Sequence, residues 1–320
     1  MIDKKDLIKA EKYLNRFGYK NLIFEKVKYG INSSSWKVSS EDRKFFLKFY
    51  IKSNNDKRDR IGAELRFTEL LKEGGFKNFP NILLTNENDN WTLFEWLDGE
   101  KIVNPNQKDL EELTLFVKKI QILSKLKNSK NIGNASEACF NLVEHKKLVI
   151  FRVKEIIKAS KGSVKEWFKS QVLESLNKCE IKYQNYFSLS NSNYLIKNKI
   201  LSPSDIGFHN VLKIKNKLYF HDFEYAGWDD PYKLIVDILI QPENVLSKHN
   251  SIKIINSLES CLRIKNYCDY LKVYLILYRA KWVSIIFKRI LQNKLSSEEE
   301  HSLLVKSSNY FIRVGMIWGL

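Results

Sequence analysis

The chain has 320 residues, of which 44% are hydrophobic and 13% aromatic, and this excludes a disordered protein and favours two lobes over one small core. Its 54 Lys and Arg against 37 Asp and Glu give a net charge of +17 at pH 7. Because no block of five or more cations occurs, we predict a generally basic surface and no nucleic-acid site.

The first third of the chain has the pattern of a small sheet with one helix. A helix is expected over 3–17 and another over 58–73, where Gly74 and Gly75 end it. Alternating apolar residues predict five strands. These are Ile23–Tyr29, Ser35–Ser39, Lys44–Tyr50, Asn81–Thr85 and Trp91–Trp96, with a hairpin turn at 86–90.

After Asp98 and Gly99 the pattern becomes helical, with helices expected over 108–127, 136–159 and 163–187, and a polar loop over 127–134. A short hairpin follows, with strands 211–214 and 217–220 around the turn Lys215–Asn216. From Pro231 onward the chain is expected to be helical. We predict an α+β protein with a lobe at 1–97, a small antiparallel sheet with one helix, and a larger, mostly helical lobe at 98–320.

The cysteines and the most apolar segment both indicate a cytoplasmic protein. Cys139, Cys179, Cys261 and Cys268 form no CxxC pair, so reduced thiols are expected. Residues 270–291 are apolar but carry five cations, which favours a buried helix over a membrane span. The charged start leads into an amphipathic helix and does not have the pattern of a signal peptide. We expect a monomer or a homodimer.

The hairpin at 211–220 is flanked by the residues that indicate the chemistry. Asp205 precedes it, Asn210 stands five residues later, and Asp222 follows the second strand. A carboxylate that deprotonates a hydroxyl, with an amide and a second carboxylate that hold Mg²⁺ on a nucleotide, fits this order. Taken alone, Asp205 is equally explained as a turn residue that caps its own backbone. The order and spacing of all three favour phosphoryl transfer.

Three segments of the first lobe fit nucleotide binding. Gly30, Ser33, Ser34 and Ser35 lie in a turn whose N–H groups and hydroxyls suit phosphate, although an ordinary hairpin turn has the same composition. Lys48 lies in an apolar strand and either pairs with Glu64 and reaches phosphate or points to solvent.

Glu69 is a rival partner for Lys48, on another face of the same helix. Backbone groups near Glu95 and Leu97, where the first lobe ends, suit an adenine edge, although an ordinary amphipathic edge strand has the same sequence pattern.

Downstream residues have both structural and functional interpretations. Residues 227–231 are expected to form a turn that enters a helix near Pro231, with Asp229 or Asp230 as its cap. For Asp237 a hydrogen bond to the catalytic loop backbone is favoured over contact with the acceptor. Tyr274, Tyr278 and Trp282 recur every four residues, which suits core packing or an aromatic cage for an alcohol-amine.

Taken in order, these segments resemble the aminoglycoside phosphotransferase and choline/ethanolamine kinase superfamily over about residues 20–290. The most specific part is 221–231, where Glu224 stands in place of the Gly of protein kinases. The resemblance implies a two-lobed protein-kinase-like fold, ATP and Mg²⁺ as cofactors, and a small hydroxylated acceptor among helices at 136–195 and 265–292. Asp205, Lys48 and Glu64 would be catalytic, and Asn210 and Asp222 would hold the metal.

The chain departs from the family at Pro203, where a histidine is usual two residues before the catalytic aspartate. The predicted function is transfer of the γ-phosphoryl group of ATP to a choline-like alcohol or to a sugar, such as one used in a surface polysaccharide. The basic chain disfavours polycationic acceptors such as aminoglycosides. The alternative is a non-catalytic kinase-fold protein that binds nucleotide or serves as a scaffold.

Overall fold

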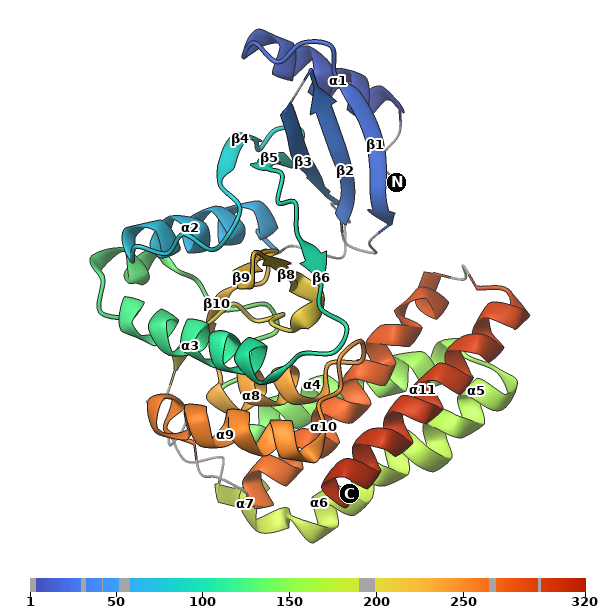
Figure 1. Ribbon diagram of the computed structural model, residues 1–320. Coiled ribbons are helices and arrows are strands. Elements are labelled where there is room, and N and C mark those ends of the chain that lie inside the picture. The colour runs from blue at the N-terminus through green and yellow to red at the C-terminus, as the bar shows by residue number, and fades with distance from the viewer. Residues whose placement is uncertain are drawn as a thin grey trace.

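The computed structural model describes residues 4–29, 33–41, 43–51, 58–189, 199–264, 269–292 and 295–320. An antiparallel sheet with a helix beside it forms the N-terminal region, and a helical part lies below it (Figure 1). The first region comprises α1 (Lys4–Arg16), β1 (Ile23–Tyr29), β2 (Ser33–Ser40), β3 (Arg43–Tyr50), α2 (Arg60–Glu73), β4 (Ile82–Asn86) and β5 (Trp91–Glu95).

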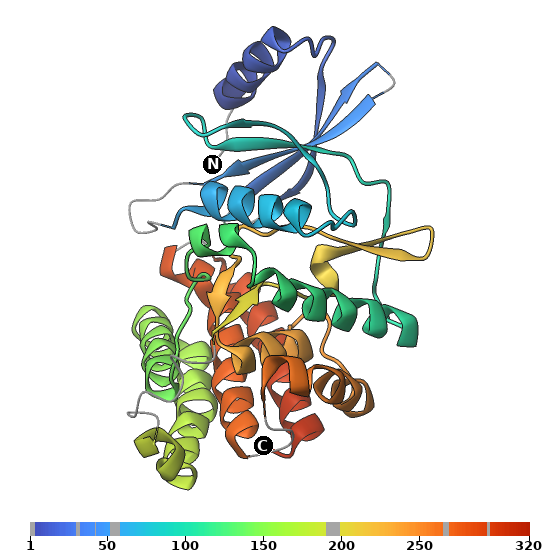
Figure 2. The same ribbon diagram turned by 90° about the vertical axis from the view of Figure 1, so that its left-hand side faces the viewer.

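The five strands pair in the order β1–β2–β3–β5–β4, all antiparallel. One face of this sheet and α1 enclose a small core that includes Ala10, Leu14, Leu47 and Trp91. Viewed from the side, α2 lies between the sheet and the helical part (Figure 2). Phe67, Leu70 and Leu71 of α2 belong to the larger core of the helical part, so this helix joins the two regions.

The helical part is interrupted by short strands near its upper edge (Figure 1). Its first half contains β6 (Glu100–Lys101), α3 (Gln107–Leu123), the 3₁₀ turn Lys127–Asn131, α4 (Leu142–Ala159), α5 (Gly162–Trp167), the π-helical turn Phe168–Leu173, α6 (Glu174–Lys182) and α7 (Gln184–Leu189). Its second half contains β7 (Ile200–Ser202), the 3₁₀ turn Phe208–Asn210, β8 (Val211–Ile214), β9 (Lys217–Phe220), β10 (Gly227–Asp229), α8 (Pro231–Ile240), α9 (Lys248–Leu262), α10 (Asp269–Ile286), the 3₁₀ turn Phe287–Gln292 and α11 (Ser297–Trp318).

Local signals explain why several elements begin and end where predicted. Asp59 caps α2 by accepting from the N–H of Gly62, and the N–H of Gly74 closes its last turn on the carbonyl of Leu70. Asp230 caps α8 by accepting from the N–H of Tyr232. The β8–β9 turn has positive φ at both Lys215 and Asn216, the geometry of a two-residue hairpin that matches strand twist.

Two segments differ from the sequence-based expectation. The helix predicted from 136 begins at Leu142, because Asn141 caps it and the preceding chain is tied to β10 by the N–H of Ala135, which donates to the carbonyl of Trp228. Residues 227–229, expected to be a turn, form β10, which pairs with β7. No helix in the described part of the chain is long and apolar enough to cross a membrane.

Candidate active site

Lys48 is a buried cation that contacts carboxylates of α2 and of the segment after β9. It lies on β3, whose last four residues are all buried, and it is itself 2% exposed. Its Nζ atom lies 2.8 Å from Glu64, 2.5 Å from Asp222 and 3.1 Å from Glu224. The structure therefore brings Lys48 and Glu64 together as predicted, and Glu69 is exposed.

Glu64 also connects the sheet to the segment after β9. One of its carboxylate oxygens accepts from the hydroxyl of Tyr50 at 2.6 Å, and the other accepts from the backbone N–H of Phe223 at 3.2 Å. Lys48 binds the same oxygen as Tyr50, so the carboxylate is held by two side chains of β3 and by the backbone after β9. Hydrogen bonds to a buried charged group are stronger than neutral ones, so Glu64 fixes the relation of β3 to Asp222.

The electrostatics of the cluster keep Lys48 charged. Burial opposes its charge, but Asp222, Glu224 and Glu64 together outweigh burial and raise its pKa well above the usual value. Burial also opposes ionisation of Asp222, yet the Lys48 ammonium lowers the pKa of that carboxyl below its ordinary value. Burial raises the pKa of Glu64. The site thus holds a lysinium and an ionised Asp222.

The β8–β9 hairpin places Asn210 and Asp222 at the same end. Val211 pairs with Phe220, and beyond this pair the N–H of His221 donates to the carbonyl of Asn210 at 3.1 Å. Asp222 has φ +69°, so the chain turns sharply there and directs it toward Lys48.

Asp205 lies in a tight turn beside this hairpin end. The N–H of Ile206 donates to the carbonyl of Ser204 across it at 2.8 Å, and the side-chain amide of Asn210 donates to the carbonyl of Asp205 at 2.9 Å. Nε2 of His209 lies 3.1 Å from Oδ1 of Asp205. Burial opposes charge on His209, but Asp205 raises its pKa above the usual value.

Glu224 was not among the predicted site residues, and it completes a group of three carboxylates. Oxygen atoms of Glu64, Asp222 and Glu224 all lie within 4.8 Å of one another. Oxygen donors of this kind suit Mg²⁺, so the residues present fit the cation expected from the sequence. The sequence signal for Glu224 was its place two residues after Asp222, but only its contact with Lys48 reveals its role.

The serine segment differs from its prediction as a turn. Ser33, Ser34 and Ser35 belong to β2, because Ser33 pairs with Tyr50 and the ladder with β3 continues from there. The Oγ atom of Ser34 accepts from the indole of Trp36 at 3.2 Å. Gly30 lies outside the described residues.

The segment proposed to contact adenine begins at the end of β5. The N–H of Glu95 donates to the carbonyl of Asn81 at 2.9 Å, and its carboxylate accepts from the Asn81 amide at 3.0 Å. Leu97 follows the strand and is half-buried. Glu95 is therefore held at the point where the chain leaves the sheet.

Two downstream tyrosines have the contacts of a packed core. The hydroxyl of Tyr274 donates to Asp230 at 2.5 Å and that of Tyr278 contacts Nδ1 of His145 at 2.8 Å, so both tyrosines are buried and hydrogen-bonded. Asp237 is also buried, and Nζ of Lys233 lies 3.9 Å from its Oδ2 atom. Its Oδ1 atom has no hydrogen-bond partner within the described residues, so the expected bond to the catalytic loop backbone is not formed. The two tyrosines therefore match the core-packing interpretation.

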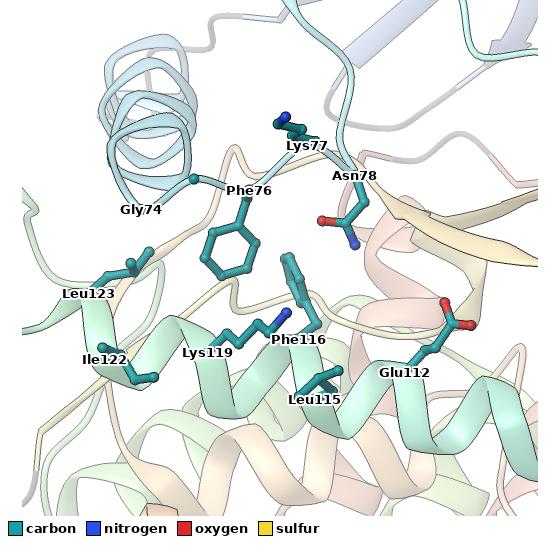
Figure 3. A pocket seen from close by; sticks show the side chains of 11 residues that line it. Gly74, Phe76, Lys77, Asn78, Glu112, Leu115, Phe116, Lys119, Ile122 and Leu123 are labelled. Atoms are coloured by element: carbon teal, nitrogen blue, oxygen red, sulfur yellow. The ribbon is translucent and has the colours of Figure 1, made fainter.

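The structure has a cavity lined by residues of α3 and of the segment after α2, and a second one that reaches Glu224. One, of about 400 Å³, is lined by Phe76 and Phe116 and by polar groups such as Asn78 and Glu112 (Figure 3). Asn78 and Glu112 bind the backbone of Leu218, so this cavity lies behind the hairpin and Lys48 does not line it. The other, of about 230 Å³, is lined by a mixed polar set. This set includes Arg58, Asp59, Arg66, Ser136, Glu137, Glu224 and Tyr225.

Comparison with known proteins supports the fold. No family model matches the chain, and no curated protein matches its sequence. Spectinomycin phosphotransferase APH(9)-Ia, in complex with ADP and spectinomycin, is similar at a TM-score of 0.67 and 13% identity, covering 97% of each chain.

Choline kinase LicA from Streptococcus pneumoniae is similar at a TM-score of 0.62 and 14% identity, covering 97% of this chain and 99% of that one. Ethanolamine kinase from Plasmodium vivax is similar at a TM-score of 0.58 and 14% identity, covering 98% and 89%. The chain therefore has the α+β fold that aminoglycoside phosphotransferases and choline/ethanolamine kinases share, which confirms the predicted fold.

Proposed function

We propose that this protein is an ATP- and Mg²⁺-dependent phosphotransferase that acts on a hydroxyl group of a small molecule. One observation carries the proposal, the buried Lys48 ammonium with Glu64, Asp222 and Glu224 around it. A buried cation held by several carboxylates beside a hairpin that presents Asn210 fits the charge pattern needed at a nucleotide phosphate. The shared fold agrees with it.

We assign the following roles to the residues of the site. Lys48, oriented by Glu64, neutralises phosphate charge, and Asp222 and Asn210 hold the metal, with Glu224 close enough to contribute. Asp205 receives the proton of the acceptor hydroxyl at a carboxylate oxygen, and His209 orients that carboxylate from 3.1 Å. Bound ATP and Mg²⁺ supply the transferred group and the charge that stabilises it. Positioning and charge neutralisation account for most of the rate.

The remaining predicted residues belong to the nucleotide side of the same proposal. Gly30, Ser33, Ser34 and Ser35 would approach the phosphates, and the backbone near Glu95 and Leu97 would bind the adenine edge. We place the division between the lobes after Leu97. The protein would act in the cytoplasm, where ATP is abundant.

The second cavity indicates the acceptor. It reaches Glu224 and Tyr225, directly after Asp222, and its rim carries both cations and carboxylates. Tyr274 and Tyr278 have their hydroxyls bound within the core and do not form an open cage. A polyhydroxylated acceptor such as a sugar fits these polar walls better than a choline-like alcohol, which needs free aromatic faces.

The test is a screen of sugars, sugar derivatives and amino alcohols with ATP and Mg²⁺, read by the mass increase of the acceptor. The wild-type protein is expected to phosphorylate one class, and Asp205→Asn is expected to be slower by about a hundredfold or more. Nucleotide binding without transfer to any alcohol would favour the scaffold alternative. Transfer at the wild-type rate by Asp205→Asn would exclude Asp205 as the base.

A further inference from the structure

The loop that carries Asp205 is held by residues other than its own proline. It runs Ser202–Pro203–Ser204–Asp205, and Ser202 and Ser204 are buried. Pro203 has neither an N–H nor a side-chain donor, so it donates no hydrogen bond that would orient the loop. Ser204 has φ +65°, a conformation that residues other than glycine adopt seldom and only when surrounding contacts hold it.

The contacts of Ser204 account for this conformation. Its N–H donates to Oγ of Ser202 at 2.9 Å, and its carbonyl accepts from the N–H of Ile206 at 2.8 Å across the turn of Asp205. Its own hydroxyl accepts from Nζ of Lys233 at 3.2 Å. The first two contacts lie within the loop, whereas Lys233 reaches the loop from α8.

Lys233 is anchored to the strands that flank this loop. It lies on α8, is 1% exposed, and its ammonium donates to Asp229, with Asp237 3.9 Å away. Asp229 ends β10 and pairs with Ile200 of β7, the strand that leads into the loop. Burial opposes charge on Lys233, but Asp229 and Asp237 raise its pKa, so the ammonium stays charged at neutral pH.

We propose that Lys233 is a positioning residue for Asp205, because its ammonium holds the Ser204 hydroxyl and thereby fixes the turn that presents the Asp205 carboxylate. This inference rests on the proposed function only for the role of Asp205. The contacts of Lys233 orient the Asp205 loop, to which Pro203 donates no hydrogen bond.

Three variants test the proposal. Lys233→Met alone leaves Asp229 buried without its cation and is expected to fold poorly. The double variant Lys233→Met/Asp229→Asn removes that uncompensated charge, and the asparagine oxygen still accepts from the N–H of Asp230. Ser204→Ala removes only the hydroxyl, and Ser284→Ala is its control, because Ser284 is also buried and, within the described residues, its hydroxyl bonds the carbonyl of Ala280 in its own helix.

The readouts are ADP affinity, Mg²⁺-dependent ATP hydrolysis with water as acceptor, and hydrogen exchange of the amides at 204–210. We expect Ser204→Ala and the double variant to bind ADP like the wild type, to hydrolyse ATP about tenfold more slowly, and to exchange the Ser204 and Ile206 amides about tenfold faster. Ser284→Ala should match the wild type in all three. A loss confined to thermal stability would indicate a merely structural residue.

The outcomes separate this inference from the proposed function. Wild-type exchange and hydrolysis in both the folded double variant and Ser204→Ala would overturn the role of Lys233 and leave the phosphotransferase proposal standing. Faster exchange in both variants, in a wild-type protein that neither hydrolyses nor transfers phosphate, would support the loop contact and refute the proposed function.

Discussion

Removal of the Lys48 ammonium is the perturbation whose effect follows most directly from the structure. In Lys48→Met the Glu64 and Glu224 side chains, 4% and 3% exposed, would face each other and Asp222 without a cation. Breaking a buried ion pair by removing one partner costs about 3–5 kcal/mol. At an unfolding entropy of about 2.1 cal/mol/K per residue, this lowers the Tm of a cooperative 320-residue chain by roughly 6 °C.

The same loss must depend on pH. Burial already raises the pKa of Glu64 above its ordinary value, and without Lys48 that pKa rises further. A carboxyl group whose folded pKa exceeds its unfolded pKa binds its proton more tightly in the folded state, so stability falls as pH increases through that range. The destabilisation by Lys48→Met should therefore be larger at pH 8 than at pH 5.

Thermal and urea unfolding at both pH values measure the effect, and Lys37→Met is the matched control. Lys37 lies on the neighbouring strand β2 and pairs with the exposed Glu25 at 2.7 Å, which predicts a loss below about 1 kcal/mol. The buried cluster would be refuted if Lys48→Met lost no more unfolding free energy than Lys37→Met. It would also be refuted if the loss in Lys48→Met were the same at pH 5 and pH 8.

Three further predictions concern other parts of the site. Asn210→Ala should raise the Mg²⁺ concentration needed for tight ADP binding by about tenfold, measured by calorimetry, and an unchanged requirement would remove Asn210 from the metal site. Burial lowers the pKa of His221 to about 4. As the pH falls from 6.5 to 4, the unfolded chain therefore binds a proton at His221 before the folded protein does, and folding stability decreases. His221→Gln should make this decrease smaller in urea titrations. Tyr278→Phe should cost about 1 kcal/mol of stability, through its lost contact with His145, while ADP affinity stays constant; weakened ADP binding would contradict its assignment to the core.

Short-range signals in the sequence were sufficient for most of the fold. The β8–β9 strands match their predicted bounds, because the two turn residues Lys215 and Asn216 and the apolar alternation around them are local features. The pairing of Lys48 with Glu64 was predicted because a lysine in an apolar strand requires an anionic partner. The start of α4 was missed because Asn141 and contacts with β10 end the preceding loop.

Contacts between distant segments were not predictable from the sequence in the same way. Glu224 reaches Lys48 across 176 residues only because α2 packs on the segment after β9, where the rings of Phe67 and Phe223 lie 5.3 Å apart. The contact of Lys233 with Ser204 depends on the pairing of β7 with β10, and residues 227–229 were expected to be a turn. Such contacts depend on tertiary packing, which local propensity does not specify.

The proposal that Lys48 and the carboxylates around it bind a magnesium nucleotide is tested most directly by calorimetric titration with ADP. Wild-type protein and Asp222→Asn would each be titrated without Mg²⁺ and with millimolar Mg²⁺. We predict that Mg²⁺ tightens ADP binding by the wild type and that Asp222→Asn loses this gain. ADP affinity that is the same in all four titrations, or no binding at all, would contradict it.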